Sequence, residues 1–257
     1  MQFIIGILFV TGCVLGGHSL HGELGILWQP VEVIIIVGAG VGAMVIGYNV
    51  DALKDAMKAL KNLLKSKPYS KNDYMELLKL LFGIFKLMKV KGMLEIESHI
   101  ENPKERNLFQ ESPAILANHH LTEFICDYLR LMTMGMDNPY HMEDLMNKEI
   151  EIHHHESHLP GAFWTQFGES LPALGIVAAV LGVINTMGSI SEPPEVLGGL
   201  IGAALVGTFL GILLSYGYFQ PIGAYLSKYG EAESEIIECI KIGFISNLQG
   251  NSKTVTI

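Results

Sequence analysis

Six residues near the middle of the chain form its densest group of potential metal ligands, His153-His154-His155-Glu156-Ser157-His158. His154 and His158 are four residues apart, a spacing that places two imidazoles on one face of a helix. A zinc-protease helix needs two residues between its glutamate and second histidine, whereas one residue separates Glu156 from His158. No cysteine or further well-spaced ligand completes a zinc set. The pattern therefore predicts a solvated helix end, with no metal and no cofactor.

A second chemical signature lies at Gly38, Gly40 and Ala43, which match the G-x-G-x-x-G/A turn of dinucleotide-binding proteins. That turn must follow a strand and open a helix within a βαβ unit. Here the apolar run continues unbroken through Ile46, and no second strand follows. This excludes a nucleotide-dependent oxidoreductase, and the chain is predicted not to be an enzyme. Gly38 and Gly42 are interpreted as glycines that pack helices together.

Polar groups are sparse in the long apolar stretches. Residues 170–191 are uncharged, 22 in all, and as a helix they would extend roughly 33 Å, enough to cross a bilayer. Pro172 lies one turn inside the start of this stretch, and small residues run along it. Small residues let helices approach closely within a membrane. We therefore expect a packed membrane helix.

The whole composition agrees with a membrane protein, because 49% of residues are hydrophobic and 17% are charged, against about 25% charged in soluble domains. Uncharged stretches at 1–22, 33–50, 170–191 and 196–227 predict four membrane-spanning helices, the last kinked at Pro221. The predicted fold class is all-α: a polytopic membrane protein with a helical cytoplasmic domain. The net charge of −9 excludes nucleic acid as a partner.

The chain is predicted to divide into four segments. Residues 1–50 hold the first two spans, 51–167 a helical cytoplasmic domain, 168–227 the third and fourth spans, and 228–257 a cytoplasmic tail. The central segment and the tail carry all 17 Lys and Arg residues, and the short connections between spans carry none. The positive-inside rule therefore places both termini in the cytoplasm.

Three longer helices are expected in the central segment, at 74–90, 115–136 and 140–155. Each carries apolar residues at steps of three and four. Ser70 and Asp73 resemble a capping box that opens the first of them.

The predicted spans lack charge. No Asp, Glu, Lys or Arg lies inside any of them, whereas proton and ion pathways normally contain such a group. The polar residues near the third and fourth spans are Asn185, Thr186, Thr208 and Ser215. Either the chain is not a transporter, or a partner supplies the ionisable residue.

Several stretches, taken in order along the chain, resemble the MotA stator subunits of the bacterial flagellar motor. They are IIIVGAGVGAMVIG, GMLEIESHIENPKE, DYLRLM, ESLPALGIVAAVLGV and LVGTFLGILLSYGYFQP. The resemblance covers essentially the whole chain. It implies an ion-driven torque generator in the bacterial inner membrane. It also implies a pentamer of this chain around a MotB dimer, with MotB supplying the ion-binding Asp and the rotor protein FliG as the cytoplasmic partner.

The resemblance also implies roles for single residues. Pro172 and Pro221 match the prolines thought to couple ion binding to conformational change. Glu97 matches the acidic rotor contact. The basic rotor contact, usually Arg, falls on Lys89, with Lys91 beside it. Lysine lacks the bidentate fork of arginine, so this position departs from the family pattern.

The transported ion is expected to be the proton. Sodium-type relatives carry a hydroxyl residue at the position that falls on Ala179, which offers no side-chain oxygen. Thr186 and Thr208 are also expected in the ion pathway, but Thr208 alone remains near this position, and one hydroxyl is a poor shell for a hard cation. Two alternatives stay open: an ExbB/TolQ-like energiser of an outer-membrane process, and a structural membrane scaffold.

Overall fold

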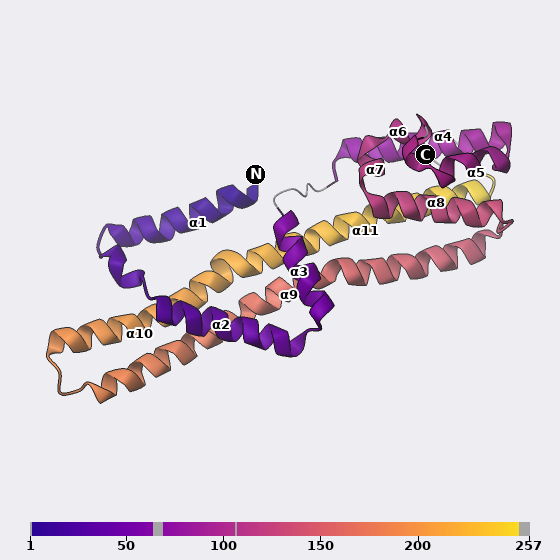
Figure 1. Cartoon of the computed structure of the whole chain (residues 1–257). Coiled ribbons are helices and arrows are strands. Elements are labelled where there is room, and N and C mark those ends of the chain that lie inside the picture. Colours follow the sequence, from indigo (N-terminus) through magenta and orange to yellow (C-terminus); the bar gives the residue numbers. More distant parts are fainter. Residues whose placement is uncertain (1, 64–68, 106, 252–257) are drawn as a thin grey trace. The chain divides into compact units, whose positions relative to one another are not determined.

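The computed structural model describes residues 2–63, 69–105 and 107–251, and within these ranges the chain forms helices and short connections without a strand (Figure 1). The predicted all-α class is therefore confirmed for this part of the chain. The chain divides into two compact units. Unit 1 contains residues 1–66 and 158–228, and unit 2 contains residues 67–157 and 229–257.

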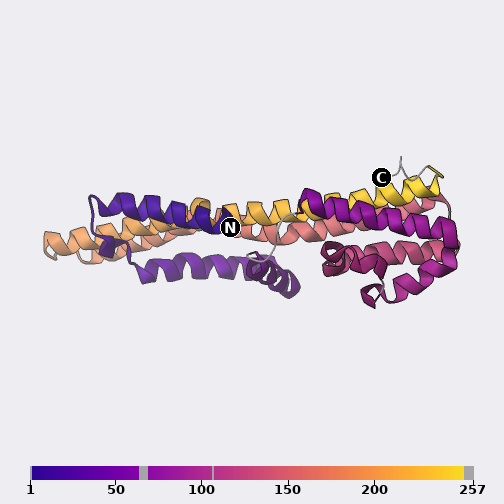
Figure 2. The same cartoon turned by 90° about the horizontal axis from the view of Figure 1, so that it is seen from above.

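Unit 1 is built mainly from apolar helices. They are α1 (Gln2–Ser19), the short turn η1 (Leu24–Leu27), α2 (Pro30–Gly47), α3 (Val50–Asn62), the second half of α9 (Pro139–Gly188), α10 (Pro194–Leu214), the π-helical turn η3 (Ser215–Phe219) and the start of α11 (Gln220–Leu248). The unit 1 part of α9 and α10 run side by side in both views (Figures 1 and 2).

Three segments are long and apolar enough to cross a membrane: Leu24–Gly47, Pro139–Gly188 and Pro194–Leu248. The apolar segment Phe3–Ser19 of α1 is shorter. The predicted helix at 140–155 and the predicted span at 170–191 belong to one helix of 50 residues, α9, which contains Pro160 and Pro172.

The predicted spans at 1–22 and 33–50 leave a connecting loop at 23–32, and this loop is wrong at its C-terminal end because α2 begins at Pro30 and includes Glu32. Proline is favoured at the first position of a helix, where its missing N–H costs nothing and its fixed φ angle suits the helix. Pro30 therefore begins the helix and does not extend the loop.

Unit 2 contains α4 (Lys71–Lys91), α5 (Met93–Glu101), the short turn η2 (Pro103–Glu105), α6 (Asn107–Gln110), α7 (Pro113–Ala117), α8 (His119–Thr133), the first part of α9 and the end of α11. Its core is aliphatic and aromatic, and its fully buried members include Leu77, Leu81, Ile84, Phe85, Ile96, Leu121, Phe124, Ile236, Ile240 and Phe244. Most of these come from the faces predicted from the periodicity.

The start of α4 confirms one local prediction, since the Ser70 backbone N–H donates to Asp73 Oδ2 at 2.6 Å. The predicted helix at 115–136 is wrong, because Asn118 divides it into α7 and α8. The Asn118 side-chain oxygen accepts from the Leu121 N–H at 3.2 Å and caps α8. Asparagine competes for backbone donors in this way, which favours a helix start over a helix interior.

Candidate functional site

Small residues hold α9 and α10 in close contact in unit 1. We call this contact the small-residue seam, formed by Gly175, Ala178, Gly182, Ala204, Gly207 and Gly211. A Cβ atom added to Gly211 would lie 2.6 Å from the Leu171 carbonyl oxygen, and one added to Gly182 would lie 2.7 Å from Ala204 Cβ. Larger side chains would push the two helices apart.

The glycine that packs α2 is Gly40. A Cβ atom there would lie 2.9 Å from Phe167 Cε2 and 3.2 Å from Leu171 Cδ2. Gly38 and Gly42 face open space within this chain, so their predicted packing role is wrong for contacts inside one copy.

Ala179 and Thr208 both adjoin the small-residue seam. The Ala179 nitrogen lies 3.4 Å from the position that a Gly207 Cβ would take, and Thr208 Cα lies 3.4 Å from the position of a Gly175 Cβ. Both side chains are half-buried. The structure thus brings these two predicted pathway residues to the same contact between α9 and α10.

Two other polar residues make hydrogen bonds to residues four or five positions away in the chain. The buried Thr186 hydroxyl donates to the Gly182 carbonyl at 2.8 Å, one turn back on α9. The fully buried Ser215 hydroxyl accepts from the Gln220 side-chain amide at 2.9 Å. Each hydroxyl is therefore held against its own helix.

Pro172 interrupts the hydrogen-bond ladder inside α9. Proline has no N–H, so the Gly168 carbonyl, four residues earlier, loses its usual helical donor. The Pro172 ring is half-buried.

Pro221 follows a second irregularity, the π-helical turn η3. The Gln220 N–H donates to the Ser215 carbonyl, five residues back, instead of four. Pro221 cannot donate to the Gly217 carbonyl, so the regular α ladder cannot be completed here. The predicted distortion at Pro221 therefore takes the form of a π-helical turn that ends just before it.

The two irregular regions pack on each other. A Cβ atom on Gly168 would lie 2.9 Å from the Gln220 nitrogen and 3.2 Å from Phe219 Cβ. Phe219 also stacks on Trp164, with ring centroids 5.7 Å apart. The weakened ladder of α9 thus lies against the widened turn that precedes Pro221.

Glu32 is a site residue that the sequence reasoning placed in a loop. The structure places it in the first turn of α2 with 8% of its surface exposed. Its Oε2 lies 2.9 Å from the position that a Gly207 Cβ would take, and it has no hydrogen-bond partner among the described residues. A carboxyl group of this chain therefore reaches the small-residue seam. The signal in the sequence was Pro30, a helix-starting residue two positions earlier.

The predicted rotor-contact residues lie on both sides of one turn in unit 2. Lys89 and Lys91 occupy the last turn of α4, and Glu97 lies on α5. All three are exposed. Gly92 joins the helices with a φ angle of +87°, a conformation that favours glycine. Lys91 pairs with Glu95 at 3.5 Å, and such an exposed pair contributes little stability.

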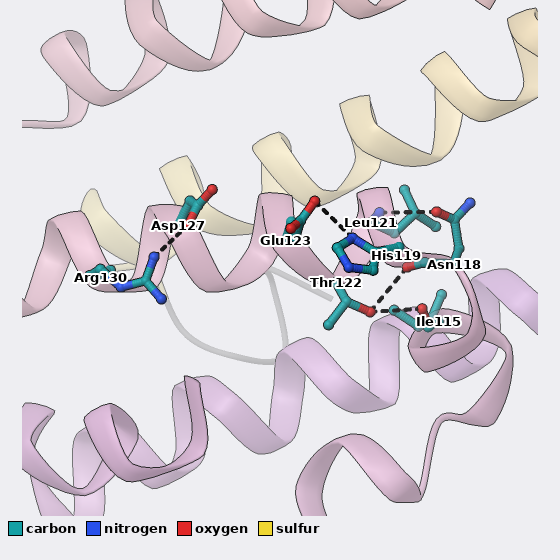
Figure 3. Close-up of polar contacts among 8 residues, drawn as sticks. All are labelled: Ile115, Asn118, His119, Leu121, Thr122, Glu123, Asp127 and Arg130. Carbon is teal, nitrogen blue, oxygen red and sulfur yellow. Dashed lines mark hydrogen bonds and ion pairs between the residues drawn. The ribbon is translucent and has the colours of Figure 1, made fainter. Parts of the chain in front are cut away.

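Arg130 on α8 is a further cation in the neighbourhood of Glu97. Both residues line a shallow depression of about 220 Å³. Arg130 pairs with Asp127 at 2.6 Å, and at the start of α8 His119 pairs with Glu123 at 2.8 Å (Figure 3). The sequence reasoning missed Arg130 as a site candidate, although it lies within the DYLRLM stretch.

The histidine cluster is not uniformly solvated, so the prediction of a solvated helix end is wrong for His153. Its ring lies 4.1 Å from that of His120 between centroids, and the Nδ1 atoms of both rings are buried. Burial, and then the neighbouring His120, lower the pKa of His153 below its ordinary value of 6.5. His154 Nδ1 lies 3.1 Å from the Ser234 hydroxyl. Among the described residues, no three His, Cys, Asp or Glu side chains are placed so that they could hold one metal ion.

Comparison with known proteins identifies the family. Residues 4–92 match the family described as motility protein A N-terminal, and residues 116–239 match the MotA/TolQ/ExbB proton channel family. Motility protein A of Salmonella typhimurium is 43% identical over 100% of this chain and 88% of the relative. Chemotaxis protein LafT of Vibrio parahaemolyticus is 35% identical over 96% of this chain and 87% of the relative.

Solved structures agree with the fold. The flagellar MotAB stator complex of Bacillus subtilis matches with a TM-score of 0.80 and 25% identity, over 98% of this chain and 91% of that chain. The C. jejuni MotAB structure has a TM-score of 0.81 and 20% identity, over 99% and 92% respectively. These relatives are motility proteins and a flagellar stator complex rather than enzymes. The chain belongs to the motility protein A family.

Proposed function

We propose that this chain is the stator subunit of a bacterial flagellar motor and that, with MotB, it forms a proton channel whose ion flow drives rotation. The observation that carries the proposal is the contact between the Gly168 region of α9 and the π-helical turn before Pro221. Two adjoining irregularities in apolar helices provide a bend that can take two arrangements. The family relationship and the MotAB structures support a MotB partner.

The assembly is proposed to be a pentamer of this chain around a MotB dimer in the inner membrane, with MotB supplying the ion-binding Asp. Residues 1–50 and 168–227 would carry four spans, counting α1, and residues 51–167 and 228–257 would be cytoplasmic. The positions of Lys and Arg support this orientation. In a chain whose native cysteines have been replaced, a cysteine at Glu195 should react in cells with an impermeant maleimide, and one at Glu105 should not. The reverse pattern would refute the topology.

The coupling path is proposed to run along the small-residue seam. Pro172 and Pro221 would transmit the change at the ion site, and Ala179, Thr186 and Thr208 would line or adjoin the path. Rotor contact is proposed for Lys89, Lys91 and Glu97, whose exposure suits long-range attraction to charges on FliG.

The proton is proposed as the ion because Ala179 stands where sodium-type relatives are expected to carry a hydroxyl residue. Alanine has no side-chain oxygen to offer a cation at that position. Sodium needs several oxygen ligands, whereas a proton needs one carboxylate. Swimming speed that depends strictly on external sodium, and that a protonophore leaves unchanged while the sodium gradient is maintained, would refute the proton assignment.

The function itself is tested in liposomes that contain this chain and its MotB partner. A proton gradient should drive proton uptake, and Asn in place of the partner's membrane Asp should abolish it. Uptake that survives this change would refute the proposal.

An ExbB/TolQ-like energiser remains the second candidate, because residues 116–239 match a family that includes those proteins. The match of residues 4–92 to motility protein A favours the motor. Restoration of swimming in a cell that lacks its own stator subunit would separate the two.

A further inference from the structure

Glu32 is a carboxyl group buried among apolar and small residues. It shares one face of α2 with the buried residues Ile36, Gly40 and Met44, each one turn further along. This face packs on α9 and α10, where Glu32 Oε2 lies beside Gly207. A glutamate at this position therefore points into unit 1 and not toward its surface.

Glu32 meets α9 and α10 well away from the connection that joins these two helices. Gly207 is 13 residues after Pro194, which corresponds to about 20 Å along α10 from its start. Its neighbour Ala178 is 10 residues before Gly188, or about 15 Å along α9 from its end. These distances place the Glu32 contact well inside the paired part of α9 and α10, and Glu32 belongs to the candidate membrane span Leu24–Gly47.

No counter-charge of this chain stands near Glu32 in the apolar helices. The stretches 170–191 and 196–227 contain no Lys or Arg, and α2 contains none either. Glu32 Oε2 is buried without a hydrogen-bond donor among the described residues. An ionised carboxylate without a partner is costly in such surroundings, and ionisable residues at membrane depth commonly serve ion or proton paths.

The position of Glu32 relates it to the proposed ion path. Gly207, which it touches, is flanked by Ala178 and Ala179 of α9 and precedes Thr208 in the chain. Because these residues are small, the carboxyl can approach the face of the seam where the partner's Asp would act. The predicted side of the short connections, from which protons would enter, is also the side on which α2 begins.

We propose that Glu32 is a proton-binding site in each copy of this chain, which takes up a proton from the side of the short connections and passes it toward the partner's Asp. An O–H bond forms at the Glu32 carboxylate when it accepts a proton from hydronium. That bond breaks when the proton moves, directly or through water, to the partner's carboxylate, and Glu32 is again ionised. No electrons are exchanged. This inference rests on the proposed channel function and adds a second ionisable group to it.

The test uses the complex with MotB in liposomes and compares Glu32→Gln, Glu32→Asp and the control Glu195→Gln. Glu195 is an exposed carboxylate in the first turn of α10 on the same predicted side. Glu32→Gln should lower proton flux about tenfold. This loss is smaller than the effect of removing a group that every proton must pass through, because water can carry some protons past Glu32. The loss should be greatest at high external pH, where protons are scarce. Glu32→Asp should retain flux with a displaced pH profile, and Glu195→Gln should match the unchanged protein.

Two further readouts separate a proton site from a structural role. Infrared spectra of the assembled complex should show a protonated-carboxyl band that changes with external pH and is missing in Glu32→Gln. A wild-type pH profile in Glu32→Gln would overturn the proposal, as would failure of both Glu32 variants to assemble with MotB. If flux still requires the partner's Asp but ignores Glu32, this inference fails while the channel function stands.

Discussion

Gly211→Ala tests the small-residue seam directly. A Cβ atom at this position would lie 2.6 Å from the Leu171 carbonyl oxygen and 3.0 Å from Gly175 Cα, both backbone atoms that cannot rotate away. Gly202→Ala is the matched control, because Gly202 lies in the same helix and a Cβ atom there would meet open space.

The expected cost follows from these distances. Non-bonded heavy atoms prefer a separation of about 3.5 Å, so a 2.6 Å contact forces α9 and α10 apart by up to about 0.9 Å. A gap of that size forfeits roughly a quarter to a half of each dispersion contact along the seam. Overpacking of this kind costs about 1–3 kcal/mol. Both variants share the gain of about 0.8–1.0 kcal/mol from replacing glycine by alanine in a helix. The difference between them should therefore be about 1–3 kcal/mol.

The assay is thermal unfolding of the purified complex, followed by the fluorescence of Trp164, which stacks on Phe219 beside the seam. Gly211→Ala should unfold at a lower temperature than Gly202→Ala, and it should also weaken swimming. Equal unfolding temperatures would show that the seam tolerates separation and would refute the reasoning.

Three other changes test separate parts of the protein. Pro172→Leu restores an N–H donor to the α9 ladder, so membrane insertion should persist while swimming is lost; normal swimming would contradict the coupling role. Lys89→Glu and Glu97→Lys should each weaken motility, because each removes an exposed ion pair with FliG worth about 0.2–1 kcal/mol. A matching charge reversal on FliG should partly restore motility. Unchanged torque in the variant that carries both reversals would exclude this contact. The lowered pKa of His153 means that the unfolded chain binds the proton more tightly, so stability present above pH 6.5 should decrease as pH falls below it. Glu233 and Glu156 oppose this effect and His154 adds to it, and His153→Gln should flatten the dependence of unfolding temperature on pH.

The parts of the fold that the sequence predicted well are those set by local chemistry. The Ser70–Asp73 capping box forms because the Asp73 carboxylate can reach backward by three residues to the Ser70 N–H. The stretch 170–191 is helical as far as Gly188, as expected for a long uncharged segment that must satisfy its backbone hydrogen bonds internally. Its glycines pack closely because small residues repeat at helical spacing, as Gly175 and Gly182 do.

The predictions that failed depended on partners distant in sequence. The polar residues around His153 predict that its side chain is solvated. Its burial depends on the packing of α8 against α9, which brings the His120 ring against it. Gly38, Gly40 and Gly42 are equivalent by composition, and only the position of Phe167 selects Gly40 as the contact. Glu32 could be assigned to a loop because its burial comes from α10, more than 160 residues later.

The relation between the two prolines also depends on tertiary contact, and it bears on how the protein could move. Each proline alone removes one N–H donor from a helix, a local defect that membrane helices tolerate. Gly168, whose carbonyl is freed by Pro172, packs on Phe219 and Gln220, which end the π-helical turn before Pro221. A shift of the backbone at Gly168 therefore requires a matching shift of the backbone at Phe219 and Gln220, or is resisted by it. Because packed interfaces change between discrete arrangements and do not deform smoothly, this contact suits a switch driven by a single proton. Replacing both prolines together should then change the unfolding temperature of the complex by less than the sum of the two single replacements, and a strictly additive change would show that the two irregular regions act independently.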